Sequence, residues 1–122
     1  MKSAVSRELR EAALPYFALI GEDRPGTGEL RQALRPAHQA HFSRPQADCV
    51  GVAGGPLLND AQEAMIGTLL VFEAVDRAAV ERFFAEDPYN TGGLFETMRI
   101  FPWRWGVGRP VSVLAAPLAG QG

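Results

Sequence analysis

Two short segments of the chain hold side chains that could transfer protons together. The run Arg35-Pro36-Ala37-His38 places an imidazole beside a guanidinium, and Asp87-Pro88-Tyr89 supplies a carboxylate much later in the chain. Imidazole gains and loses protons near neutral pH, and a carboxylate partner can orient it and stabilise its charged form. Arg35 could hold negative charge on a substrate oxygen, because its planar fork pairs with oxyanions. Such a set would suit general acid–base chemistry on a small molecule.

Each of these residues also has an ordinary structural interpretation. His38 could be a half-exposed surface histidine, Asp87 a helix-ending residue before proline, and Arg35 a solvated helix residue. The second histidine, His41, is expected to lie in the core with a hydrogen bond to the backbone. A zinc site needs more ligands than the two histidines supply, and no ligand cluster of recognised spacing exists. We therefore expect neither a metal nor another cofactor.

Four further residues are candidates for binding a substrate. Tyr16 and Tyr89 could line a pocket for a flat ring, although aromatic side chains in a small domain more often build its core. Gly55 and Pro56 belong to the run Gly54-Gly55-Pro56, which either lets the backbone approach a ligand closely or simply ends a strand. Without a following helix this run does not predict a phosphate-binding loop.

The elements that must position these residues follow from the periodicity of the apolar side chains. A helix is predicted over 29–42, with an apolar stripe on one face. That stripe consists of Leu30, Ala33, Leu34, Ala37 and His41. His38 lies at the edge of the stripe, which is typical of a group at the rim of a pocket. A second helix is predicted to begin after Asp76, a good N-cap, and to end at Asp87-Pro88.

Four strands accompany these helices, over 16–21, 49–53, 64–74 and 95–103. The order β-α-β-β-α-β predicts an α+β, ferredoxin-like fold, in which two helices cover one face of an antiparallel four-stranded sheet. The other face would stay apolar and uncovered, with Phe101, Trp103 and Trp105 near its end. We therefore expect a homodimer that packs its sheets face to face.

Length and composition define the class of protein. The 122 residues suffice for one domain, and the net charge of -2 argues against a nucleic-acid partner. No apolar stretch approaches the ~20 residues that cross a bilayer, and the start of the chain lacks the apolar region of a secretory signal. The single cysteine, Cys49, has no basic neighbour and is interpreted as a structural thiol in a reducing compartment. A cytoplasmic protein with no membrane partner is expected.

The chain resembles the YciI-like (YCII-related) family of the dimeric α/β-barrel superfamily. The matching pieces are Tyr16–Gly21 with Glu22-Asp23, Arg35-Pro36-Ala37-His38, Gly54-Gly55-Pro56-Leu57, Glu86-Asp87-Pro88-Tyr89 and the strand through Phe101-Pro102. The resemblance implies a domain over 15–104, with an N-terminal extension over 1–14 and a tail over 105–122. The tail could add an edge strand or contact a second subunit.

The resemblance also implies a pocket with a histidine–aspartate pair, in which His38 and Asp87 take the family's two positions. Asp48 is a second carboxylate candidate, but the segment 43–50 lacks the family's usual glycine turn. Gln39 also departs from the pattern, because an aliphatic residue is usual there.

Two classes of function are therefore compared. The first is a lyase or isomerase without a cofactor, which isomerises, dehydrates or dehalogenates a small cyclic or aromatic compound. In that enzyme His38 moves the proton, Asp87 supports the imidazolium and Arg35 steadies the developing charge. The alternative is a non-catalytic module for small-ligand binding or dimerisation, in which His38 and Asp87 would lie too far apart to share a ligand. RNA binding on the sheet ranks last, because strand 64–74 offers no basic residue.

Overall fold

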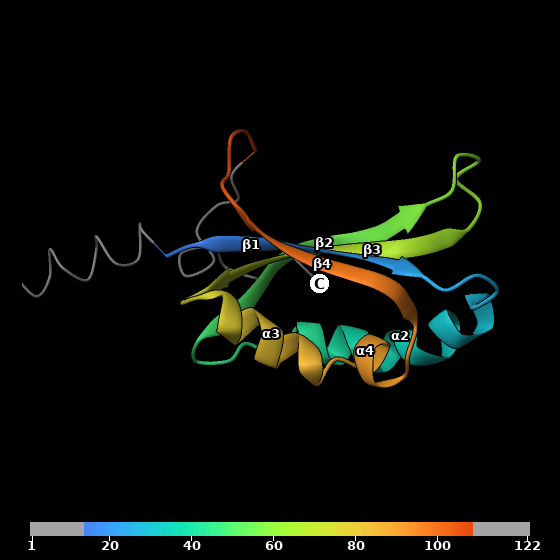
Figure 1. The fold of residues 1–122 in the computed structure, drawn as a ribbon, viewed down its shortest axis with the longest axis horizontal. Helices are drawn as coiled ribbons and strands as arrows, with labels where there is room; N and C mark the ends of the chain where they lie inside the picture. The colour runs from blue at the N-terminus through green and yellow to red at the C-terminus, as the bar shows by residue number, and fades with distance from the viewer. Residues whose placement is uncertain (1–13, 109–122) are drawn as a thin grey trace, which may run out of the picture.

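The computed structural model describes residues 14–108, which form a four-stranded sheet covered by helices on one face (Figure 1). The elements are β1 (Tyr16–Asp23), α2 (Gly28–Phe42), β2 (Cys49–Leu58), β3 (Met65–Ala74), α3 (Arg77–Ala85), α4 (Pro88–Thr91) and β4 (Phe95–Trp103). The strand order is β2-β3-β1-β4, and all neighbouring strands are antiparallel. The α+β, ferredoxin-like fold is confirmed. Residues 1–13 and 109–122, which hold most of the expected extension and tail, lie outside the described residues.

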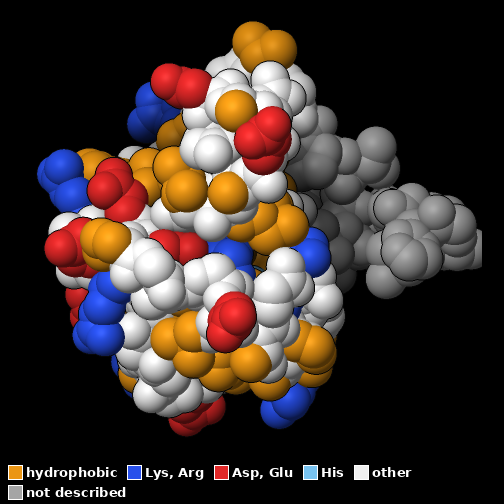
Figure 2. Space-filling view, turned by 90° about the vertical axis from the view of Figure 1, so that its right-hand side faces the viewer, with side chains coloured by type: hydrophobic (Ala, Val, Ile, Leu, Met, Phe, Trp, Pro, Cys, Tyr) orange, Lys and Arg blue, Asp and Glu red, His pale blue; other side chains and the backbone are white. Residues whose placement is uncertain are grey.

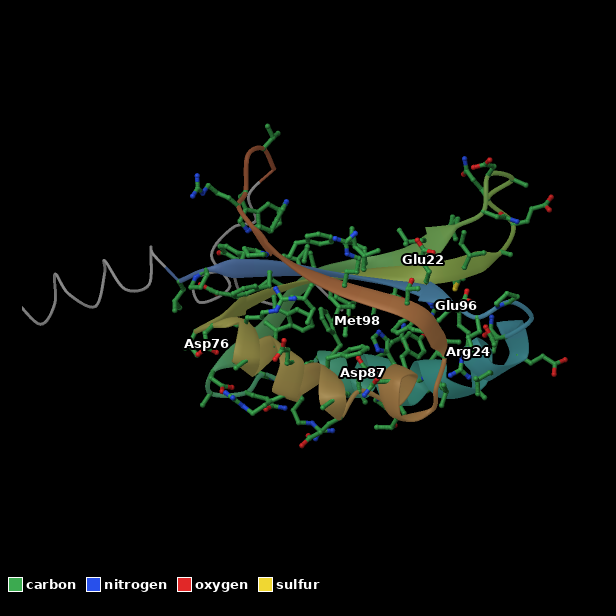
Figure 3. The ribbon with its side chains drawn as sticks, viewed as in Figure 1. Glu22, Arg24, Asp76, Asp87, Glu96 and Met98 are labelled. Carbon is green, nitrogen blue, oxygen red and sulfur yellow. The ribbon has the colours of Figure 1, made fainter. Side chains whose placement is uncertain are left out.

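The core lies between the sheet and α3. Alternate side chains of the central strands point toward the helices, and Leu19 on β1 and Phe72 on β3 are fully buried. Phe83 of α3 packs its ring edge-on against Phe72, with ring centroids 5.3 Å apart. The helix begins where expected, because the Asp76 carboxylate accepts a hydrogen bond from the Ala79 N–H at 2.9 Å (Figure 3).

The second strand is longer than the sequence predicts. We expected Gly54-Gly55-Pro56 to end it, but β2 continues through this run to Leu58. Pro56 lies opposite Thr68 of β3, and β2 is an edge strand whose outer side needs no partner. A proline without an N–H is tolerated on such an edge. The run therefore forms part of the sheet, directly opposite α2.

The buried face of α2 also differs from the predicted apolar stripe. Ala33 and Ala37 are exposed, whereas Arg31, His38 and His41 are buried. Polar side chains can lie inward when each finds a partner, and small alanines gain little from burial. His41 behaves as expected, because its Nε2 lies 2.8 Å from the Phe83 carbonyl oxygen. The buried face of the helix therefore carries polar groups whose partners lie in the sheet for Arg31, in α3 for His41 and at the start of α4 for His38.

The opposite face of the sheet is not covered by any element of residues 14–108 (Figure 1). Large apolar side chains on this face remain partly exposed, including Leu69 at 37%, Phe101 at 36% and Trp103 at 37%. Arg99 of β4 lies over the Phe101 ring, 4.6 Å from its centroid. Among the described helices, none has the length and apolar character that a membrane span requires.

Candidate active site

The start of α4 brings Asp87 to His38. The sequence predicts that the second helix ends at Asp87-Pro88, and there Pro88 begins a further one-turn helix, since proline suits the first helical position. Asp87 caps this helix, and its Oδ1 accepts a hydrogen bond from the Tyr89 N–H at 2.8 Å. Figure 3 shows Asp87 in the helix layer beneath β4. The short helix thus fixes the carboxylate independently of His38.

His38 and Asp87 form a buried pair. The His38 Nδ1 lies 2.9 Å from Oδ1 and 3.0 Å from Oδ2 of Asp87. Asp87 is 0% exposed and His38 is 7% exposed. An ionised carboxylate only accepts hydrogen bonds, so Nδ1 carries the hydrogen, and Nε2 of the neutral ring keeps a free lone pair. This arrangement leaves one ring nitrogen able to take a proton.

Tyr89 holds the imidazole plane from one side. Its ring stacks on the His38 ring, with centroids 3.9 Å apart and planes at 10°. On the same helix as His38, the Phe42 ring lies 6.2 Å away. Burial raises the pKa of the Tyr89 hydroxyl, with the Asp87 and Asp23 carboxylates adding to the effect against Arg31 and Arg35. Tyr89 is therefore a protonated phenol at neutral pH.

Sequence reasoning missed Arg31, which is 3% exposed. Its Nε and Nη2 donate to the two carboxylate oxygens of Asp23, at 2.7 and 2.9 Å. Nη2 also donates to Thr68 Oγ1 at 2.7 Å, and Nη1 donates to the Tyr89 hydroxyl oxygen at 3.3 Å. The spacing of the sequence could have indicated Arg31. The three residues Arg31, Arg35 and His38 follow one another at intervals of four and three, which places them on one face of the helix.

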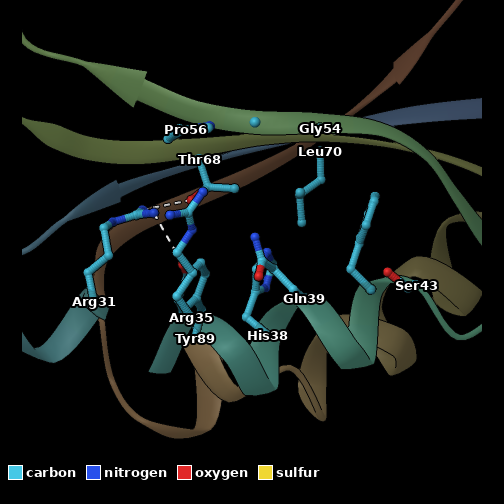
Figure 4. Close-up of a pocket in the computed structure, with 12 residues that line it drawn as sticks. Arg31, Arg35, His38, Gln39, Ser43, Gly54, Pro56, Thr68, Leu70 and Tyr89 are labelled. Carbon is cyan, nitrogen blue, oxygen red and sulfur yellow. Dashed lines mark hydrogen bonds between the residues drawn. The ribbon is translucent and has the colours of Figure 1, made fainter. Parts of the chain in front are cut away.

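A cavity of about 220 Å³ lies beside His38. Helix α2 lines it with Arg31, Arg35, His38 and Phe42, and the opposite wall comes from β2 and β3 (Figure 4). Figure 2 shows basic side chains set back between the sheet and helix layers at the end that carries the β2–β3 hairpin. The cavity is open to solvent on one side and is large enough for a small ring.

Most of the residues predicted for binding or chemistry meet at this cavity. Arg35, Gly55, Pro56 and Tyr89 line it together with His38. Tyr16 is not among the described residues that line it. Its ring packs edge-on against Trp105, with centroids 5.8 Å apart. Tyr16 therefore does not join His38 at this cavity, and the β1 register places it opposite Trp103.

The remaining candidates have structural surroundings. Asp48 accepts a hydrogen bond from Arg82 Nη2 at 2.7 Å, on the surface and outside the cavity lining. Cys49 is buried, and burial, followed by the charge of Asp48 and opposed by Arg82, raises its pKa to about 12. Residues 14–108 contain no group of three or more His, Cys, Asp or Glu side chains that could hold a metal ion.

Fold and site together define a ferredoxin-like α+β domain with a buried histidine–aspartate pair at the edge of a small cavity. Residues 16–104 match the YCII-related domain, and the chain belongs to this family. An uncharacterised protein of Haemophilus influenzae is 24% identical over 94 residues, which cover 73% of this chain and 96% of that protein.

A solved structure with the same fold carries a named activity. It is 5-chloro-2-hydroxyhydroquinone dehydrochlorinase from Burkholderia phenoliruptrix, in complex with 2,5-dihydroxybenzoquinone. The two structures align with a TM-score of 0.67 and 29% sequence identity. The alignment covers 75% of this chain and 95% of the dehydrochlorinase chain.

Proposed function

We propose that this protein is a small-molecule enzyme that performs general acid–base chemistry on a small cyclic or aromatic compound. The observation that carries the proposal is the buried His38–Asp87 pair, whose 2.9 Å contact leaves the second ring nitrogen of a cavity-lining histidine free. A base must reach its proton through direct contact or one water, and the cavity offers that contact. A non-catalytic module would be distinguished by a large separation between His38 and Asp87. The two side chains lie 2.9 Å apart, so this feature is absent.

The proposed reaction is a proton abstraction, followed by isomerisation or by loss of a leaving group. His38 Nε2 takes a proton from the substrate, and the freed electron pair forms a new double bond in the ring. In an isomerisation the imidazolium returns this proton to a different atom of the substrate. In an elimination the electron pair expels a leaving group such as chloride, and the imidazolium then returns its proton to solvent. Asp87 fixes the tautomer and stabilises the imidazolium, and Arg35 steadies negative charge on a substrate oxygen. This sequence balances without a cofactor.

The related dehydrochlorinase supports the substrate class. Its name describes the loss of hydrogen chloride from a hydroxylated, chlorinated ring, and its bound ligand is a hydroxylated quinone. A cavity of about 220 Å³ is of a size for one such ring. Tyr89, Gly55 and Pro56 would contact the ring in this chain.

We also propose that the chain forms a homodimer through the uncovered face of its sheet. Leu69, Phe101 and Trp103 are each more than a third exposed on that face. Large apolar side chains exposed on one face of a small protein mark an interaction surface, and a two-fold pairing of identical faces would remove them from water.

The test of catalysis uses His38→Asn, because the asparagine amide can still donate to Asp87 from near the Nδ1 position while Nε2 is lost. The full chain is incubated with 5-chloro-2-hydroxyhydroquinone and with chlorine-free hydroxyquinols. Chloride release and exchange of ring hydrogens with deuterated solvent are measured. We expect the variant to lose about 10²–10⁴-fold in rate.

The matched control is Asp48→Asn, which changes a surface carboxylate outside the cavity lining and should leave the rate unchanged. Equal rates for wild type and His38→Asn would contradict the role of His38. A wild-type protein that binds these compounds but neither releases chloride nor exchanges hydrogen would favour the non-catalytic module.

A further inference from the structure

We infer that the end of the cavity next to Arg31 is an oxyanion-binding site, formed by the hydroxyls of Thr68 and Tyr89 and the guanidinium of Arg35. Its ligand is a planar ring with negative charge delocalised over oxygen, such as a hydroxyquinone or an enolised ring ketone. This inference rests on the proposed function and names the substrate class of the same cavity. Arg31 is the positioning residue of this site.

Arg31 determines which way the two hydroxyls point. Arginine only donates hydrogen bonds, so the oxygens of Thr68 and Tyr89 both act as acceptors toward it, as the dashed lines of Figure 4 show. Each hydroxyl has one hydrogen, and these two contacts do not use it. Within residues 14–108 neither side-chain hydroxyl has another hydrogen-bond partner. Both residues line the cavity, so both hydrogens are available to a ligand there.

The direction of these bonds is stable because Arg31 is itself fixed. Asp23 holds its guanidinium with two hydrogen bonds of 2.7 and 2.9 Å, and both side chains are at least nine-tenths buried. A bidentate pair of this kind leaves the guanidinium little freedom to rotate. Burial also keeps the Tyr89 phenol protonated, because it raises its pKa. The site is therefore arranged before a ligand arrives, which strengthens the binding of charge.

The charge of the cavity favours an anion. Its described lining includes the guanidinium groups of Arg31 and Arg35 and no Asp or Glu side chain. Asp23 compensates the charge of Arg31, and Asp87 compensates a protonated His38. Arg35 makes no ion pair with any residue of the described range 14–108, so its charge remains for a ligand. One uncompensated cation next to two hydroxyl donors matches a delocalised oxyanion.

The shape of the cavity and the position of His38 complete the description of the ligand. Gly54 and Gly55 present bare strand backbone opposite α2, which suits the flat face of a ring. His38 Nε2 is an acceptor at the same cavity, so the ligand must also offer a proton. A ring hydroxyl conjugated to a carbonyl provides both features, because it is acidic and its anion spreads charge over two oxygens.

The test is a binding experiment on full-length protein carrying His38→Asn, in which proton transfer by this residue is absent. The probe is 2,5-dihydroxybenzoquinone, which is an anion at neutral pH, and the matched neutral probe is 2,5-dimethoxybenzoquinone. Calorimetry gives the dissociation constants. We expect the anion to bind at least tenfold more tightly than the neutral ring, because hydrogen bonds to charged groups contribute most.

Single substitutions then remove each donor without changing the shape of the cavity. Thr68→Val and Tyr89→Phe should each weaken binding of the anion about tenfold or more, and should change binding of the neutral ring little. Thr68→Ser is the control, because it keeps the hydroxyl and should stay within about threefold of the parent. Arg35→Gln should weaken binding of the anion in the same way as Tyr89→Phe.

The role of Arg31 is tested by Arg31→Lys, alone and combined with Tyr89→Phe. If Arg31 acts through Tyr89, the double variant binds the anion no more weakly than Arg31→Lys alone, whereas independent effects would add. Equal binding of both probes, or anion binding that is unchanged in both Thr68→Val and Tyr89→Phe, would overturn the oxyanion site. Tyr89-dependent anion binding without turnover in wild type would instead overturn only the proposed catalysis.

Discussion

The Tyr89 ring lies almost parallel to the His38 imidazole, with centroids 3.9 Å apart and an angle of 10° between the planes. Two residues before it, Asp87 bonds the edge of the same imidazole and caps the helix that carries Tyr89. One short turn of chain therefore fixes both the position and the orientation of His38. The arrangement depends on Asp87 more than on any other single residue, since it serves the histidine and the helix together.

Asp87→Ala should destabilise the fold more than Asp76→Ala does. Both aspartates cap a helix, and losing a cap costs about 1 kcal/mol. Asp87→Ala also leaves the buried Nδ1–H of His38 without its partner, which costs about 1–3 kcal/mol more. Urea denaturation should therefore show a loss of about 2–4 kcal/mol for Asp87→Ala and about 1 kcal/mol for Asp76→Ala. Equal losses would mean that the contact with His38 contributes nothing to stability.

The sequence predicted the order of the elements because each has a local cause. Asp76 caps α3, and a residue before proline leaves the helical region, which ends α3 before Asp87. Once two helices lie on one face of the sheet, the first helix and the exit of the second become neighbours. The meeting of His38 and Asp87 could therefore be anticipated from the expected fold and the family resemblance.

Other features depend on tertiary partners that a linear pattern does not show. Arg31 looks like a solvated helix residue, and its burial makes sense only with Asp23 on β1 as its partner. The apolar stripe was assigned wrongly for the same reason, since hydrophobicity alone turns Ala33 inward and Arg31 outward. The run Gly54-Gly55-Pro56 has the composition of a turn, and only its place on the sheet edge allows it to continue β2.

Leu69→Asp should disrupt the proposed homodimer. Leu69 lies on β3, in the interior of the sheet order, and its side chain is 37% exposed on the uncovered face. A carboxylate there would have to be desolvated in a face-to-face dimer, and pairing it against apolar side chains is unfavourable. Light scattering after size exclusion should give the mass of a dimer for wild type and of a monomer for the variant.

The control for this experiment is Ala33→Asp, which adds the same charge to the exposed side of α2. It should leave the dimer intact. A monomeric wild type would contradict the proposed homodimer. A dimer that persists in Leu69→Asp and dissociates in Ala33→Asp would place the interface elsewhere.

Alkaline pH should destabilise the fold through Cys49. In the unfolded chain its thiol ionises near the ordinary pKa of 9.0, whereas burial raises the pKa in the folded protein to about 12. Above pH 9 the unfolded state therefore releases a proton that the folded state keeps, so the free energy of unfolding falls as pH rises toward 12. The fall has a limiting slope of about 1.4 kcal/mol per pH unit from this group.

Cys49→Ala removes this contribution and should flatten the decline between pH 9 and 11, measured by urea denaturation at each pH. Tyr89, whose pKa is also raised, keeps its own share of the slope in both proteins. A thiol that stays protonated is also a poor nucleophile, so iodoacetamide should modify folded Cys49 slowly at pH 9.5 and rapidly in urea. Two results together would contradict this prediction: fast modification of the folded protein, and an equal fall of the unfolding free energy with pH in wild type and Cys49→Ala. They would mean that burial does not raise the pKa of the Cys49 thiol.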